Sequence, residues 1–196
     1  RLSRAAGRGV LAVIGGPHLP ELAEGLVLGA HVFSRSSGPA PARPSRIDIV
    51  LAGHDEAQLS AVDAVLERAW SIGAATGWAR DLASEPSSTK NPAWLGAQAT
   101  RVLEPLGVDV AVHDEAWLAQ RGFGGVLAVG GGSATGPRLI EASWRPRGSA
   151  RGPHLVLVGK GITFDTGGLN VKHGDAMTLM HTDMSGGAAV PGALRI

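Results

Sequence analysis

The sequence predicts an α/β fold in which helices alternate with the strands of a largely parallel sheet. Short apolar runs of strand length recur along the chain, separated by stretches with apolar residues at three- and four-residue spacing. One run, Leu155–Val158, is apolar at every position, which is typical of a strand buried on both faces. With 44% hydrophobic and 18% charged residues among 196, the composition is that of a globular protein.

The first part of the chain is predicted to contain a strand, a helix and a second strand. Val10–Ile14 and Ile47–Ala52 have the apolar character of strands. Pro20–Ala30 has helical spacing, with Glu21 in its first turn, where an acidic residue complements the helix dipole. Ser34–Pro44, rich in Ser, Pro and Gly, is expected to be a loop.

The longest helical pattern is His54–Ala83. Gly73 and Gly77 each weaken such a helix by about 1 kcal/mol relative to Ala, which indicates close packing at these two positions. A helix of this length suits a connector between domains. Ser84–Pro92, with its serines and prolines, is expected to end it.

Further helices and strands alternate after this break. Pro92–Leu103 is predicted to be a helix, Val108–His113 a strand, and Asp114–Gln120 a short helix capped by Asp114. The remaining strands are predicted at Val126–Val129, Leu139–Trp144 and Leu155–Val158.

Composition excludes several classes of function. The net charge of +1 comes without a basic run, so neither nucleic acid nor a membrane surface is an expected partner. The absence of cysteine excludes disulfides, thiolate zinc sites and cysteine nucleophiles, and it fits a reducing cytoplasm. No apolar stretch approaches the ~20 residues that span a bilayer.

Single charges recur in the apolar, glycine-rich stretch that follows Leu155–Val158. Among them are Lys160, Asp165, Lys172 and Asp183. An unpaired charge in such surroundings is costly unless a counter-charge or a metal ion satisfies it. Because open α/β sheets bind ligands beyond the carboxyl ends of their strands, we expect these side chains to face one cavity at that edge. Two lysines and two carboxylates in one cavity suit a hydrolytic metal centre.

The same stretch carries a family signature. Val158–Gly168 reads Val-Gly-Lys-Gly-Ile-Thr-Phe-Asp-Thr-Gly-Gly, Lys172 follows, and Asp183–Ala188 reads Asp-Met-Ser-Gly-Gly-Ala. Together they resemble the catalytic signature of the leucyl aminopeptidase family, the two-metal cytosol aminopeptidases. Three upstream segments are also similar to that family in order and spacing: Ala79–Leu82, Gly107–Val110 and Gly124–Gly130.

The resemblance implies a three-layer α/β catalytic domain around a central, largely parallel sheet, incomplete here and preceded by the end of a smaller α/β domain. We expect residues 1–53 to be the C-terminal part of that N-terminal domain and residues 54–83 the linking helix. Residues 84–196 are expected to form the first part of the metallopeptidase catalytic domain.

The resemblance also implies a role for each matched residue. Lys160 would bind a metal ion through an unprotonated amine, Asp165 would bridge two metal ions, and Asp183 would be a terminal ligand of the ion bound by Lys160. Lys172 would stay protonated and act catalytically and in substrate binding, because a fixed ammonium stabilises charge on the scissile carbonyl oxygen. Met180 would line the pocket for the first side chain of the substrate.

Structural alternatives stay open for these residues. Lys160 can be a surface lysine at a strand end, and either Asp165 or Asp183 can be a turn or helix-cap residue. Lys172 can be a solvated lysine or the partner of Asp175.

Other features of the sequence are assigned no site. His173 and His181 do not form a His-Glu-x-x-His pair. Gly130–Ser133 fits neither a dinucleotide-binding fingerprint nor a P-loop, so nucleotide binding is not expected.

The function implied is that of a metal-dependent aminopeptidase that releases N-terminal amino acids, leucine among them, from peptides through a water activated by two metal ions. The cofactors would be two divalent ions, zinc or manganese with magnesium as a further candidate. The partners would be peptides with a free N-terminus, in a cytoplasmic homo-hexamer. The alternative is a catalytically inactive remnant or paralogue that serves as a binding or structural module.

The chain is expected to be an internal piece of a longer protein, because it begins without Met and lacks the family's second metal-binding block, Asn-Thr-Asp-Ala-Glu-Gly-Arg. We predict that purified residues 1–196 hydrolyse leucine amide at trace rates at most, because catalytic groups that act as a unit fail together when some are missing. Substantial hydrolysis in this assay would require a different mechanism.

Overall fold

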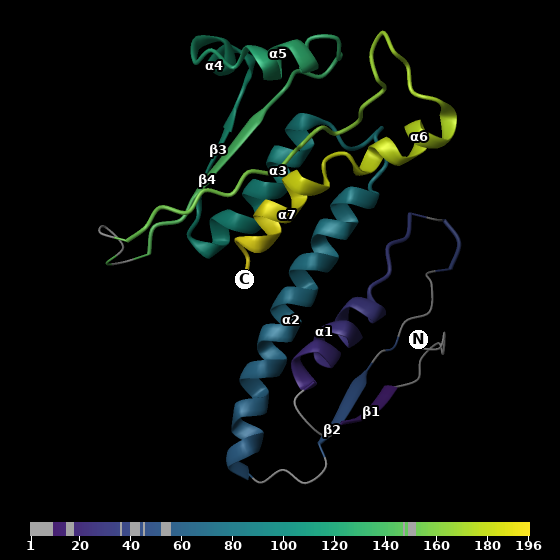
Figure 1. Ribbon diagram of the computed structural model, residues 1–196, viewed down its shortest axis with the longest axis vertical. Coiled ribbons are helices and arrows are strands. Elements are labelled where there is room, and N and C mark those ends of the chain that lie inside the picture. The colour runs from purple at the N-terminus through teal and green to yellow at the C-terminus, as the bar shows by residue number, and fades with distance from the viewer. Residues whose placement is uncertain are drawn as a thin grey trace. The chain divides into compact units, whose positions relative to one another are not determined.

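The computed structural model describes residues 10–14, 18–35, 37–39, 44, 46–51, 56–146, 148 and 152–196. The chain divides into two compact units between Trp78 and Ala79, inside the long helix α2 (Glu56–Ser84). Each unit combines helices with a pair of strands (Figure 1), so the predicted α/β class is confirmed.

The first unit contains the predicted strand, helix and strand. β1 (Val10–Ile14) and β2 (Ile47–Leu51) pair in parallel along their whole length. Helix α1 (Leu19–Ala30) connects them in the sequence, with Pro20 in its first turn. Its buried residues recur at intervals of three and four, which gives the helix one apolar face: Leu19, Ala23 and Leu26.

The two glycines of α2 permit the close packing that the sequence predicts. A Cβ atom on Gly73 would overlap the side chain of Val27 in α1. A Cβ atom on Gly77 would lie 3.0 Å from Nδ1 of His31, just after α1. Glycine at these two positions of α2 therefore lets α1 and the residue after it lie closer to α2 than a residue with a Cβ atom would allow.

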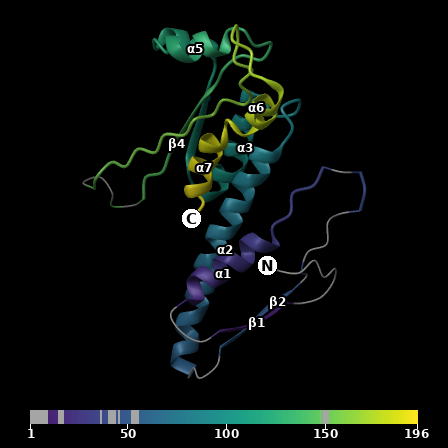
Figure 2. The same ribbon diagram turned by 45° about the vertical axis from the view of Figure 1, so that its right-hand side comes forward.

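The second unit is built around helix α3 (Pro92–Leu103). It packs against β3 (Asp109–His113), β4 (Leu139–Ser143) and helix α7 (Ser185–Ala193), and the views of Figures 1 and 2 agree that α3 and α7 lie side by side. The core of this unit comprises Leu82, Leu95, Ala99, Leu103, Val108, Leu118, Met184 and Ala188.

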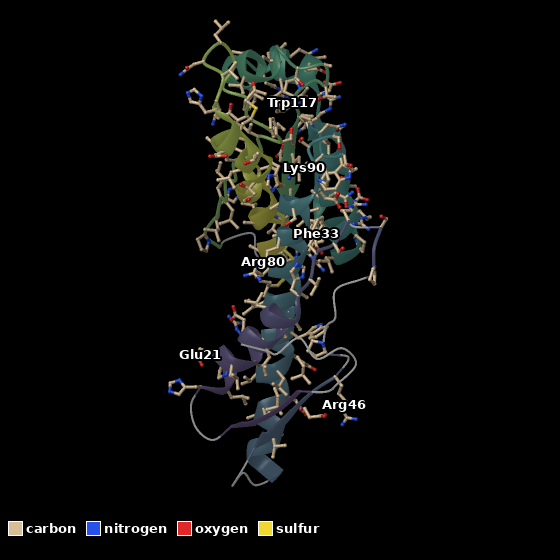
Figure 3. The ribbon with its side chains drawn as sticks, turned by 90° about the vertical axis from the view of Figure 1, so that its right-hand side faces the viewer. Glu21, Phe33, Arg46, Arg80, Lys90 and Trp117 are labelled. Carbon is tan, nitrogen blue, oxygen red and sulfur yellow. The ribbon has the colours of Figure 1, made fainter. Side chains whose placement is uncertain are left out.

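Side-chain caps fix the starts of two helices in this unit. Asn91 accepts a hydrogen bond from the backbone N–H of Trp94 at the start of α3. Asp114 accepts one from Trp117 N–H at the start of α4 (Glu115–Gln120), as predicted. The Trp117 ring, labelled in Figure 3, then stacks on His113 with 3.7 Å between ring centroids, which joins α4 to the end of β3.

The remaining elements of the second unit are short. They are η1 (Glu104–Leu106), α5 (Gly124–Gly130), α6 (Gly174–Thr178) and η3 (Leu179–Thr182).

The prediction of a strand at Val126–Val129 is wrong, because these residues lie within helix α5. A four-residue apolar run does not distinguish a short helix from a strand by periodicity. Here the N–H of Leu127 bonds to the carbonyl of Phe123 in the helical pattern, and α5 packs against α4.

The strand predicted at Leu155–Val158 is also not formed. These residues lie in neither a helix nor a strand, and Val158 is 89% exposed. A strand needs a neighbouring strand for its hydrogen bonds, and hydropathy alone does not supply one. Among the described residues of the second unit, the strands form one antiparallel pair, β3 with β4, in place of the largely parallel sheet that was expected.

Within the part of the chain that the structure describes, no helix combines the length and the apolar character needed to cross a membrane.

Candidate functional site

The position of Lys160 is set by a close contact between two backbone segments. The N–H of Gly187, in the first turn of α7, donates a hydrogen bond of 2.6 Å to the carbonyl of Lys160. A Cβ on Gly159 would overlap the carbonyl oxygen of Gly186, and a Cβ on Gly187 would lie 2.9 Å from Cα of Gly161. Glycines on both segments therefore let the loop lie directly on the start of the helix.

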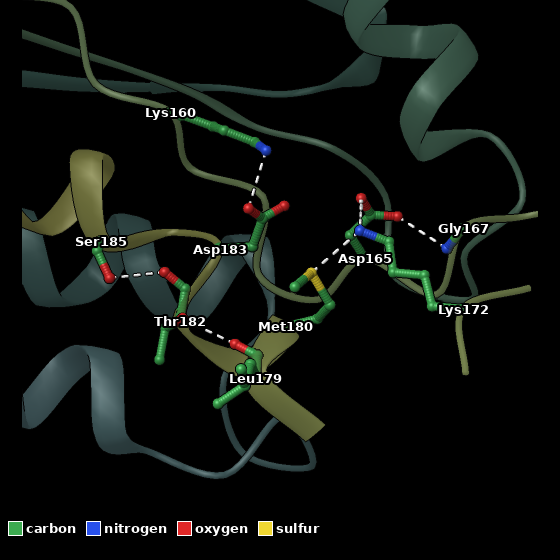
Figure 4. A network of polar contacts seen from close by, with 9 residues as sticks. All are labelled: Lys160, Asp165, Gly167, Lys172, Leu179, Met180, Thr182, Asp183 and Ser185. Carbon is green, nitrogen blue, oxygen red and sulfur yellow. Dashed lines mark hydrogen bonds and ion pairs between the residues drawn. The ribbon is translucent and has the colours of Figure 1, made fainter. Parts of the chain in front are cut away.

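This contact places Lys160 beside Asp183. Lys160 Nζ donates to Asp183 Oδ1 at 2.8 Å, and the Asp183 side chain is only 18% exposed (Figure 4). Asp183 Oδ2 is buried and finds no hydrogen-bond partner among the described residues. A buried carboxylate oxygen without a partner is costly, so this atom is suited to a cation.

Asp165 and Lys172 form a second ion pair. Lys172 Nζ lies 2.9 Å from Asp165 Oδ2, and Asp165 Oδ1 accepts a hydrogen bond of 2.8 Å from the N–H of Gly167 (Figure 4). The hydrogen bond from Lys172 is the largest cause, and that from Gly167 the second, of a pKa of Asp165 below its usual value. Asp165 is therefore ionised at neutral pH.

A tight turn brings Lys172 back over Asp165. The N–H of Lys172 donates to the carbonyl of Thr166 at 2.9 Å, and the N–H of Asn170 donates to the carbonyl of Gly167 at 3.2 Å. Gly167 has φ +89°, in the left-handed region that favours glycine. The Gly167-Gly168 pair thus lets the segment turn back on itself, so that the ammonium of Lys172 meets the carboxylate of Asp165.

The segment before α7 completes the network. Lys172 Nζ also contacts Met180 Sδ at 3.1 Å, and the N–H of Asp183 donates to the carbonyl of Met180 at 3.2 Å. Met184 follows Asp183 and is fully buried. The buried Met184 side chain anchors the backbone next to the exposed network.

The structure brings the four charged residues together as two ion pairs on a partly exposed surface, not at the edge of a parallel sheet. Lys160 lies close enough to Asp165 for its charge to lower the pKa of Asp165 further. Lys160 is 57% exposed. The loop–helix contact, and not a strand end, therefore positions Lys160.

The structural alternatives are answered in part. α7 begins after Met184, and no side chain caps it, so Asp183 is not its N-cap. Lys172 pairs with Asp165. His181 Nδ1 lies 2.6 Å from the carbonyl of Thr178, consistent with a structural histidine. In the ranges described, no group of three or more His, Cys, Asp or Glu side chains could hold a metal ion.

A set of possible metal ligands that includes a lysine is still present in the site. Lys160, Asp165 and Asp183 offer an amine nitrogen and carboxylate oxygens. One of these oxygens, Asp183 Oδ2, has no hydrogen-bond partner among the residues that the structure describes. Mixed oxygen and nitrogen ligands suit zinc or manganese. The residues present therefore fit a divalent metal ion.

One neighbouring residue, Lys90, could not be identified from any pattern in the sequence. It is a lone lysine in a turn, and its buried ammonium is hydrogen-bonded to the carbonyl of His181, beside the network. A contact between residues 91 positions apart has no local pattern from which it could be predicted.

Comparison with known proteins identifies relatives of this chain. Residues 77–196 match the family model described as "Cytosol aminopeptidase family, catalytic domain". The chain is 39% identical over 177 residues to the probable cytosol aminopeptidase of Syntrophotalea carbinolica, covering 88% of this chain and 35% of that protein. It is 40% identical over 169 residues to that of Leifsonia xyli, covering 85% and 33%.

Two solved structures are also similar to this chain. The bottromycin maturation enzyme BotP in complex with Mn is similar with a TM-score of 0.73 and 30% identity, over 90% of this chain and 35% of that one. The leucine aminopeptidase of Caenorhabditis elegans is similar with a TM-score of 0.75 and 25% identity, over 96% and 37%. The chain spans about a third of the length of the curated relatives it matches.

The loop–helix contact predicts a specific sensitivity to added side-chain atoms. Gly159→Ala should lower the free energy of unfolding by about 1–3 kcal/mol, because the new methyl group overlaps the Gly186 carbonyl. Gly132→Ala is the matched control, since a Cβ there meets open space, and it should change stability by about 0.5 kcal/mol or less. Denaturant unfolding of both variants checks this; equal stabilities would contradict the proposed contact.

Proposed function

Because the chain belongs to the cytosol aminopeptidase family, we propose that its two ion pairs are part of a metal-dependent aminopeptidase site that releases N-terminal amino acids from peptides. The observation that carries the proposal is the carboxylate of Asp183. One of its oxygens is paired with Lys160, and the other is buried without a hydrogen-bond partner among the described residues. The four charged residues are also those at which the sequence resembles the family signature.

Lys160, Asp165 and Asp183 would hold the metal ions. We propose two divalent ions, zinc or manganese, and the similarity to BotP, which was solved in complex with Mn, supports manganese as one of them. When bound, such ions supply Lewis-acid activation of water and of the substrate carbonyl. The two lysines balance the two carboxylates in charge, so the site is electrically compensated before any ion arrives.

Asp165 would enter the reaction as an oriented anion. The N–H of Gly167 fixes Oδ1 at 2.8 Å, while Oδ2 faces the ammonium of Lys172. Because both contacts lower the pKa of Asp165, its carboxylate is ready to bind cations at neutral pH.

Lys172 would stabilise charge on the substrate. Its side chain is 29% exposed, so its ammonium can reach a bound peptide. A hydrogen bond from this ammonium to the scissile carbonyl oxygen would stabilise the negative charge that develops there, and one such donor typically contributes about 3 kcal/mol. Met180, in contact with Lys172, would offer an apolar thioether to the first side chain of the substrate.

The family resemblance supports the wider proposals. We propose peptides with a free N-terminus as substrates, a cytoplasmic location and assembly as a homo-hexamer. Residues 1–53 would end an N-terminal domain, 54–83 would link the domains, and 84–196 would begin the catalytic domain, in keeping with the match of 77–196 to the family's catalytic-domain model.

The two lysines are predicted to fail in different ways in the complete gene product. Lys160→Ala removes a metal ligand, so the bound metal per subunit should fall and added metal should partly restore activity. Lys172→Ala should keep its metal but lose about a hundred- to a thousandfold in turnover. Lys172→Arg should not restore full activity, because a planar guanidinium cannot place its charge where the ammonium lies.

Elemental analysis of the purified variants, combined with peptide-hydrolysis rates, tests this assignment. Arg101→Ala is the control, because Arg101 is a surface residue of α3 that bonds to Gln98 at 2.7 Å. It should match the unsubstituted protein in both readings. Equal metal loss in Lys160→Ala and Lys172→Ala would show that the role given to Lys172 is wrong.

A further inference from the structure

Lys90 is buried although it carries a charge. It is 1% exposed, and within the part of the chain that the structure describes it is buried more deeply than any other charged side chain. A buried ammonium is tolerated only where hydrogen bonds replace its water. The contacts of Lys90 therefore indicate what its burial achieves.

All three N–H groups of the Lys90 ammonium have acceptors. Nζ lies 3.0 Å from the carbonyl oxygen of Leu82, 2.9 Å from that of Ala83 and 2.5 Å from that of His181. The first two carbonyls belong to the last turn of α2, where a helix leaves its carbonyls without intrahelical partners. A cation at this end also interacts favourably with the helix dipole.

The backbone of Lys90 is itself fixed. Its N–H donates to the carbonyl of Pro86 at 3.0 Å, and the next residue, Asn91, caps α3. The side chain thus starts from a rigid junction between two helices of the core. Figure 3 marks the position of Lys90.

The third hydrogen bond reaches the segment that carries the site. His181 lies between Met180, which contacts Lys172, and Asp183, which contacts Lys160. Lys90 therefore ties the backbone between these two residues to the ends of α2 and α3. On its other side the segment is held by the fully buried Met184.

The charge needed for three hydrogen bonds is present at neutral pH. Burial lowers the pKa of Lys90 to about 8, and the negative charge of Glu85 opposes this decrease. A pKa near 8 leaves the amine mostly protonated at pH 7.

We propose that Lys90 is a positioning residue that holds the Met180–Asp183 backbone in place and thereby sets the metal affinity of Asp183. The effect on metal affinity rests on the proposed function; the effect on the backbone does not. The hydrogen bonds of Lys90 go to the carbonyls of Leu82, Ala83 and His181 and to none of the three proposed metal ligands, so Lys90 acts on the site only through His181.

The first test is a calorimetric titration, in which Mn²⁺ is added to the metal-free, complete gene product and its affinity is measured. Lys90→Met keeps the length and burial of the side chain and removes its donors. It should weaken Mn²⁺ binding by about ten- to a hundredfold, the usual effect of losing a residue that orients a ligand. Lys90→Gln, with two amide N–H groups on a shorter stem, should fall between and serves if the Met variant does not fold.

Two controls separate positioning from general destabilisation. Leu118→Ala shortens a fully buried side chain in α4, so it should lower the thermal midpoint without changing Mn²⁺ affinity. Arg101→Met removes an exposed cation from α3 and should change neither quantity. Unchanged Mn²⁺ affinity in the Lys90 variants, or the same loss in Leu118→Ala, would overturn the proposed effect on the metal.

Hydrogen exchange of the same proteins without metal tests the backbone effect separately. The amide of Asp183, which bonds to the carbonyl of Met180, should exchange at least about tenfold faster in Lys90→Met, while the amides of α4 keep their rates. Equal rates at Asp183 would overturn the proposal. Absence of Mn²⁺ binding by the unsubstituted protein would instead refute the proposed function and leave the exchange result to decide the role of Lys90.

Discussion

The site depends on one steric constraint, the close approach of the loop around Lys160 to the first turn of α7. The N–H of Gly187 bonds to the carbonyl of Lys160 at 2.6 Å, and side chains on the facing glycines would keep the two backbones apart. This contact places the amine of Lys160 on the carboxylate of Asp183. Because α7 also packs on α3, the same contact joins the loop to the core of the second unit.

Charge compensation is the second organising principle. The structure pairs each of the two lysines of this stretch with an aspartate: Lys160 with Asp183 at 2.8 Å, and Lys172 with Asp165 at 2.9 Å. The pairing leaves Asp183 Oδ2 without a hydrogen-bond partner in the described part of the chain. The arrangement is therefore stable as a set of ion pairs and still has an oxygen suited to a cation.

Structural features that depend on neighbouring residues were predicted well from the sequence. Features that depend on partners far away in the chain were not. The helices Pro92–Leu103 and Asp114–Gln120 were predicted because spacing and capping are properties of neighbouring residues. Leu155–Val158 was predicted to be a strand from hydropathy, which says nothing of a neighbouring strand, and the described residues supply none. The charged residues of the site were recognisable by their spacing, whereas Lys90 depends on a contact 91 residues away.

The central claim is that Asp165 and Asp183 bind metal ions, and anomalous X-ray diffraction from crystals of the complete gene product grown with Mn²⁺ tests it most directly. The account predicts anomalous peaks within about 2.0–2.6 Å of carboxylate oxygens of both aspartates, which is the typical range for such ligands. One of these peaks should lie beside Asp183 Oδ2. Peaks held only by histidine side chains, or none within that range of Asp183, would contradict it.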